Sequence, residues 1–202
     1  METVAAVAVG AVVLGALLVA SGARAQARKR DAFIAACTPL GATVLAGPTP
    51  ACVLERAGLR LVLMRVERRD QLPPRVDVLL EAALSLIPAG GVVLRENEKP
   101  SHHGPPEAAP KVEAALTPQV RAVVTQRLGG RLAFRSLDTL VPDAAFRVLL
   151  RTRWADEWRG MLLQTWLPLG ASTAELETAV TGLLEVRAAL VSSPGVEERG
   201  RG

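Results

Sequence analysis

The residue types that most often carry catalysis are few in this chain and form no recognised pattern. The two histidines, His102 and His103, are adjacent in a proline-rich segment. A metal site there would need Glu98, Cys37 or Cys52 as further ligands, and no known ligand spacing joins them. The short signatures of dinucleotide sites, phosphate-binding loops, zinc proteases and serine hydrolases are also absent from the sequence. The sequence therefore predicts no cofactor and no metal ion.

Two neighbouring carboxylates, Asp156 and Glu157, lie between Trp154 and Trp158. Side chains that are adjacent on an extended segment point in different directions, so this pair is poorly placed to share a substrate. If the segment is instead a helical turn, the two tryptophans share one face and offer a docking point for a partner.

The two cysteines, Cys37 and Cys52, fall in a predicted helix and a predicted strand. In the cytoplasm we expect both to be reduced and buried as small apolar side chains. Outside the cytoplasm they could form one disulfide across a short loop. Neither has a neighbouring histidine in the sequence, which argues against a catalytic nucleophile.

Arginines alternate along two predicted strands, residues 131–137 and 146–153. If these strands pair with their arginine faces aligned, they form a basic surface, with Asp77 and Glu81 as candidate partners. Such a surface suits anionic lipid headgroups or an acidic protein. Charge reversal of Arg147 and Arg151 should then weaken binding to the partner or to liposomes. The candidate interaction surface consists of these arginines and two nearby tryptophans: Arg131, Arg135, Arg147, Arg151, Arg153, Trp154 and Trp158.

An enzyme is the alternative function, with its site near the 99–116 and 154–158 segments. Convergence of Glu98, a histidine and Asp156 in a polar pocket would favour it. Since the sequence names no nucleophile with its base and no set of metal ligands, we expect a binding protein rather than an enzyme.

The net charge of +4 is concentrated near the amino terminus. Four cations follow the first apolar stretch, and without them and Glu2 the chain holds 20 cations and 19 anions. A nucleic-acid-binding domain carries its positive excess as a patch on the folded domain, and stacking needs aromatic residues. Only 3% of the residues here are aromatic, so no nucleic-acid partner is expected. The four cations are Arg24, Arg28, Lys29 and Arg30.

Residues 3–23 contain no charged side chain. As a helix they would span roughly 31 Å at about 1.5 Å per residue, close to the thickness of the bilayer core. The sequence therefore predicts a single transmembrane helix in contact with lipid. A cleaved secretory signal is the rival, because Ala23-Arg24-Ala25 fits a cleavage pattern. Two features argue against a signal peptide. The residues before the apolar run include no cationic side chain, and the run is longer than the apolar region of a usual signal peptide.

The orientation of the predicted span follows from its flanking charges. The basic cluster lies directly behind the span, and basic flanks remain in the cytoplasm. We therefore expect the amino terminus outside and the folded domain in the cytoplasm. The alternative places the domain outside the cytoplasm, as a periplasmic or extracellular envelope protein.

The pattern beyond the span predicts an α+β domain with a mainly antiparallel sheet and helices packed on one face. Strands at 42–46, 51–56 and 59–67 precede a half-exposed strand at 75–83, for which a helix at 77–86 is the alternative. A long proline-rich loop follows at 99–116, with a helix near its end as the alternative. The later elements are a helix from Pro118 to Gly129, strands at 131–137, 146–153 and 161–167, and a helix with a capping box at Ser172–Glu175.

The predicted organisation has four parts and leaves the oligomeric state open. They are a transmembrane anchor at 1–23, a basic juxtamembrane helix at 24–40, an α+β domain at 41–192 and a disordered tail at 193–202.

Overall fold

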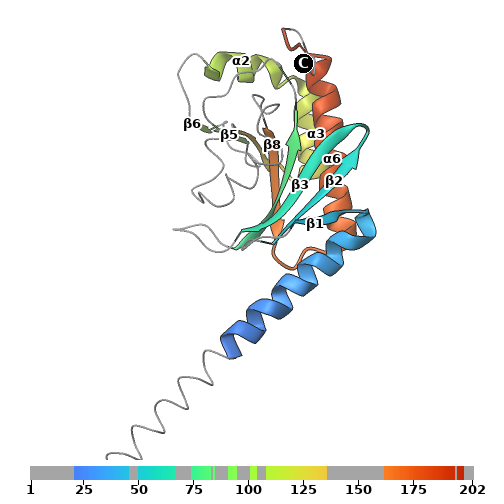
Figure 1. The fold of residues 1–202 in the computed structure, drawn as a ribbon. Helices are drawn as coiled ribbons and strands as arrows, with labels where there is room; N and C mark the ends of the chain where they lie inside the picture. Colours follow the sequence, from blue (N-terminus) through green and yellow to red (C-terminus); the bar gives the residue numbers. More distant parts are fainter. Residues whose placement is uncertain are drawn as a thin grey trace, which may run out of the picture.

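The computed structural model places helices against one sheet, which gives an α+β fold (Figure 1). It describes residues 21–45, 50–66, 74–82, 84, 91–94, 101–103, 108–135, 162–193 and 195–197. Within them, eight strands form one sheet in the order β1-β2-β3-β4-β8-β7-β5-β6, and all neighbours are antiparallel. The strands are β1 (Thr43–Leu45), β2 (Ala51–Arg56), β3 (Leu59–Val66), β4 (Arg75–Glu81), β5 (Gly91–Leu94), β6 (Ser101–His103), β7 (Leu132–Arg135) and β8 (Leu162–Pro168).

A helix over residues 21–37 leads into the domain and agrees with the helix expected at 24–40. Its last turns pack on the domain through Phe33 and Cys37, which are buried. A short 3-10 helix, η1 (Thr38–Leu40), continues it. Pro39 removes a backbone donor, and Gly41 ends the segment in the left-handed conformation with φ 75°.

The hairpin expected between residues 51–56 and 59–67 is present as β2 and β3. Its turn consists of Ala57 and Gly58, both with positive φ, at 51° and 71°. Two left-handed residues in succession match the twist of the flanking strands. Glycine adopts this conformation freely, whereas alanine is disfavoured there by its Cβ.

Replacing Ala57 with asparagine should therefore stabilise the protein by roughly 0.5–1 kcal/mol, because asparagine tolerates the left-handed conformation. Urea unfolding of the full-length protein in mild detergent measures the change. Gly58→Ala is the matched control and should destabilise, since its φ of 71° then carries a Cβ. Equal destabilisation by both substitutions would contradict this description of the turn.

The centre of the sheet is buried on both faces. Strand β3 was expected to be central, and it lies between β2 and β4 with its interior residues buried. Strand β4 corrects the sequence analysis: it is not a helix, and its five inner residues, Asp77 among them, are all buried rather than half-exposed. The polar residues of β4 are Asp77 and the residues at its two ends. Their spacing suggested that one face of the strand is exposed to solvent, but Asp77 is buried in the structure.

Two helices cover one face of the sheet, α3 (Pro118–Leu128) and α6 (Thr173–Val191) (Figure 1). Their predicted ends agree with the structure. The Thr117 side chain accepts a hydrogen bond from the Val120 N–H, and Ser172 and Glu175 form the reciprocal capping box. The main core lies beneath these helices and includes Val120, Val124 and Leu128 of α3, Leu176, Val180, Leu183, Val186 and Leu190 of α6, and Leu61, Leu63, Val78, Leu80, Phe134 and Leu163 of the sheet.

Several further predictions concern segments that the structure describes in part. The 99–116 segment contains a helix near its end, α2 (Ala108–Ala115), as the sequence allowed, and also a short strand, β6, that was not expected. The strand expected at 146–153 lies outside the described residues. Of the expected tail, Val196 is described and is buried against the core.

The predicted membrane span falls mainly on residues 1–20, which lie outside the described residues. In the described part of the chain, no helix is both long enough and apolar enough to cross a bilayer.

Candidate functional site

A chain of polar side chains crosses β4, β8 and β7 on the sheet face that points away from α3 and α6. Strand alternation places Asp77 and Gln164 on this face, because their neighbours Val78 and Leu163 point into the core beneath the helices. Both polar residues are buried, with 4% and 2% of their surfaces exposed. A buried carboxylate in a central strand is stable only with hydrogen-bonding partners.

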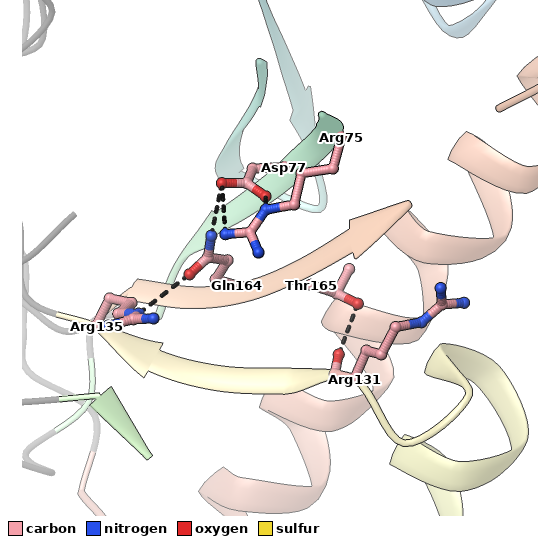
Figure 2. Close-up of polar contacts among 6 residues, drawn as sticks. All are labelled: Arg75, Asp77, Arg131, Arg135, Gln164 and Thr165. Atoms are coloured by element: carbon pink, nitrogen blue, oxygen red, sulfur yellow. Dashed lines mark hydrogen bonds and ion pairs between the residues drawn. The ribbon is translucent and has the colours of Figure 1, made fainter. Parts of the chain in front are cut away.

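Those partners come from three strands, and we call the set the Arg75–Arg135 network: Arg75, Asp77, Gln164 and Arg135 (Figure 2). Arg75 Nε lies 2.7 Å from Asp77 Oδ1. The Gln164 side-chain amide donates to Asp77 Oδ2 at 2.7 Å and accepts from Arg135 Nε at 3.2 Å. Gln164 thus links the carboxylate to the second arginine.

An aromatic ring holds one end of the network. The Arg75 guanidinium lies over the Trp166 ring, 5.2 Å from its centre. This distance is within the range of a cation–π contact. Arg75 is therefore fixed by a carboxylate and by a ring, which leaves it little conformational freedom.

The network holds two cations and one carboxylate. Burial raises the pKa of Asp77 above its ordinary value, and the charge of Arg75 opposes this shift without cancelling it. Burial also lowers the pKa of Arg135, and repulsion by Arg75 adds to that effect. Arg135 nevertheless keeps its charge at neutral pH, because an arginine titrates only at very high pH. The charged groups of the network therefore sum to +1.

The raised pKa of Asp77 predicts a specific dependence of stability on pH. In the folded protein Asp77 keeps its proton to a higher pH than in the unfolded chain, where its value is 3.8. The folded state then binds more protons in the window just above pH 3.8, so the contribution of Asp77 to stability falls as pH rises through that window. Urea unfolding of wild type and Asp77→Asn at several pH values should show the difference shrinking with rising pH. A difference that grows would mean that the ion pair outweighs burial.

The structure does not bring Arg131 and Arg135 together as a joint surface. Arg131 precedes β7, and its Nε donates to the Leu128 carbonyl at the end of α3, 3.3 Å away. Its own carbonyl accepts from the Thr165 hydroxyl at 2.6 Å. Figure 2 shows the two arginines at opposite ends of β7. Arg135 contributes to the network, whereas Arg131 caps a helix.

Asp77 was a candidate partner for the arginine face, and it is linked to Arg135 through Gln164, whereas its direct ion pair is with Arg75. The other members of the predicted interaction surface, Arg147, Arg151, Arg153, Trp154 and Trp158, lie outside the described residues. Their role as a surface stays a prediction.

The proposed ligands of an enzymatic site are only partly described. His103 and His102 lie on β6, opposite Gly91 and Val92 of β5. Glu98 and Asp156 lie outside the described residues. Within the described ranges, no three histidine, cysteine or carboxylate side chains are grouped closely enough to hold a metal ion.

Sequence reasoning missed Arg75 and Gln164 as site residues. A signal was present for Gln164. Asp77 interrupts the apolar centre of β4, and Gln164 and Thr165 interrupt the apolar run of β8. Buried polar residues at such positions need hydrogen-bonding partners, which a paired strand can supply.

Comparison with known proteins gave no match for this chain among family models, curated proteins or solved structures. The proposal below therefore rests on the sequence and the structure.

Proposed function

We propose that this chain is a single-pass membrane protein whose α+β domain acts as a binding module at the membrane surface. Residues 3–23 form the anchor, and the helix over residues 21–37 connects it to the domain. An anchor confines the domain to a thin layer beside the bilayer and raises its effective concentration toward membrane partners.

The exposure of the connecting helix is the observation that carries this proposal. Every residue from 21 to 32 is exposed, whereas Phe33 and Cys37 are buried in the domain. Helix 21–37 projects away from the sheet in Figure 1. It is also fixed by a hydrogen bond, since buried Arg65 donates to the Gln26 side chain at 3.0 Å. A projecting, cationic helix that directly follows an apolar run is suited to connect a membrane anchor to a domain at the bilayer surface.

The cations on this helix face solvent. Arg24, Arg28, Lys29 and Arg30 are all exposed, and Arg30 also forms an exposed ion pair with Asp31 at 3.3 Å. Each basic residue near an anionic membrane contributes about 1 kcal/mol of attraction. The same cluster keeps the domain on the cytoplasmic side in this proposal.

The binding partner in this proposal carries an anionic group. The Arg75–Arg135 network supplies one more cation than anion in a partly desolvated place, where charge recognition is stronger than in water. In crosslinked pull-downs from native membranes, Arg135→Gln should lower recovery of the partner. Glu55→Gln, which changes an exposed carboxylate elsewhere on the sheet, is the matched control. Equal recovery with both variants would exclude the network as the binding site.

A topology reporter tests the membrane arrangement. Alkaline phosphatase fused to the carboxyl terminus in bacterial cells should stay inactive, because it folds only outside the cytoplasm. Replacing the four cations by glutamate should raise its activity, since the positive-inside signal is then lost. Strong activity of the wild-type fusion would contradict the proposed orientation and favour an envelope protein.

A further inference from the structure

One buried cation of the sheet contacts the connecting helix. Arg65 lies near the end of β3, opposite Val76 of β4, and strand pairing places both on the face that carries the main core. Only 3% of the surface of Arg65 is exposed. Its guanidinium donates a hydrogen bond to the Gln26 side chain at 3.0 Å. A buried charge is stable only where hydrogen bonds replace its lost hydration, so this contact helps to keep Arg65 in place.

The contact lies on the side of the helix that faces the domain. Gln26 precedes the buried residues Phe33 and Cys37 by about two and three turns, at about 3.6 residues per turn. The three side chains therefore form one stripe along the helix. This stripe begins at a polar contact with the sheet and ends in the main core. The two levels of contact are about 16 Å apart along the axis, at about 1.5 Å per residue.

The inner level is held by several contacts. The buried residues of this part belong to the main core. The Thr173 hydroxyl of α6 donates to the Ala36 carbonyl at 3.0 Å, and the Arg56 guanidinium of β2 donates to the Leu40 carbonyl at 2.6 Å. The end of the helix is therefore joined to α6 and β2 whether or not Arg65 is in place.

The outer part of the helix, residues 21–32, is exposed throughout. Apolar burial therefore contributes little to its stability, and isolated helices shorter than about 12–15 residues are marginal in water. Gly22 lowers the helix propensity, and Arg24 and Arg28 repel each other one turn apart. The helical structure of this part is consequently sensitive to a contact with the sheet.

We infer that the hydrogen bond between Arg65 and Gln26 is a latch that keeps the outer part of the connecting helix folded. With the latch closed, residues 21–37 form one rigid element with the sheet. With the latch open, residues 21–32 fray while the inner end stays in the core. The latch concerns contacts within the described residues and does not depend on a membrane anchor. Its role in fixing the orientation of the domain at the bilayer rests on the proposed function.

Hydrogen exchange followed by mass spectrometry, on the full-length protein in mild detergent, tests the latch. Gln26→Ala should speed exchange at residues 21–32 by roughly tenfold, the loss expected for a hydrogen bond to a charged group. Alanine has the higher intrinsic helix propensity, so propensity alone predicts the opposite change. Ala27→Gln is the matched control. It adds a glutamine about 100° around the helix with the latch intact, and should change exchange by less than about twofold.

A second variant removes the donor instead of the acceptor. Arg65→Met keeps a long side chain at the buried position, and should speed exchange at residues 21–32 while α6 stays protected. If this variant fails to fold, Gln26→Ala still decides the question, because Gln26 is exposed.

Two results would overturn the latch. One is exchange at residues 21–32 of Gln26→Ala that is as slow as in the wild type. The other is equal acceleration by Ala27→Gln, which would show that this part of the helix responds to its own sequence and not to the sheet. Failure of the proposed function is seen separately, in the alkaline phosphatase reporter, and leaves these exchange rates unchanged.

Discussion

Asp77→Ala should lower the free energy of unfolding by about 3 kcal/mol, because it breaks a buried ion pair from one side. The Arg75 and Gln164 side chains would lose their shared acceptor in a place that water does not readily reach. The loss reflects these unsatisfied donors more than the net value of the pair. Urea unfolding of the full-length protein in mild detergent measures it.

Three further variants separate the causes of that loss. Asp77→Asn should cost only about 1 kcal/mol, since its carbonyl still accepts one hydrogen bond and the buried carboxylate is gone. The double variant Arg75→Met with Asp77→Leu should recover most of the loss, because neither charge is then buried. Glu55→Gln alters an ion pair in which the Glu55 side chain is 70% exposed, and should change stability by less than about 0.5 kcal/mol. An alanine variant as stable as wild type would show that the network is not buried in solution.

Gly182→Leu should destabilise the protein by about 3 kcal/mol, because α6 and α3 approach too closely there for a side chain. A Cβ at Gly182 would lie 2.6 Å from Leu128 Cδ2 and 2.9 Å from Arg127 Cβ. The Leu128 methyl group can move aside, but the Arg127 Cβ is bonded directly to the backbone of α3 and cannot move without it. The Arg127–Glu185 ion pair, 3.0 Å long, spans the same contact and would be displaced as well. Thermal unfolding followed by circular dichroism measures the loss.

Alanine at the same position should cost less, about 1 kcal/mol, since its higher helix propensity offsets part of the overlap. Gly22→Ala is the matched control, because a Cβ there meets nothing within 4 Å. It should leave global stability unchanged. If Gly182→Leu behaves as this control does, the two helices are not in contact as described.

Local signals predicted much of the fold because they act over a few residues. The cap at Thr117, the capping box at Ser172 and the turn at Gly58 each depend on neighbouring backbone groups, and all lie where the sequence indicates. The buried centre of β3 was likewise visible, since both of its alternating sets are apolar. Antiparallel pairing of consecutive strands follows from their short connections.

The order of the strands could not be predicted in the same way. Strand β8 inserts between β4 and β7, so its neighbours are far away in the sequence. The pairing of Asp77 with Gln164 follows only from that insertion. Without it, Asp77 resembles a solvent-facing residue of a half-exposed strand, which was the error made for β4. Long-range pairing is a property of the whole sheet and leaves little trace in a local pattern.

The candidate site was predicted in part, for the same reason. Arg135 was recognised as a member of a basic strand, and Asp77 as a partner for it. Arg131 belongs to the same alternating pattern as Arg135, but it lies before the first residue of β7. Its side chain donates to the Leu128 carbonyl at the end of α3. Alternation predicts a shared face only within the strand itself.

Extraction of membranes with sodium carbonate tests the central proposal most directly. The full-length protein, expressed in bacterial cells, should stay in the pellet, as integral membrane proteins do. Val12→Lys with Val13→Lys places two charges in the apolar run and opposes insertion by about 5–7 kcal/mol, so this variant should move to the supernatant. Ala32→Lys with Ala35→Lys adds the same charge at exposed positions of the connecting helix and should remain in the pellet. Recovery of intact wild-type protein in the supernatant would contradict the membrane anchor.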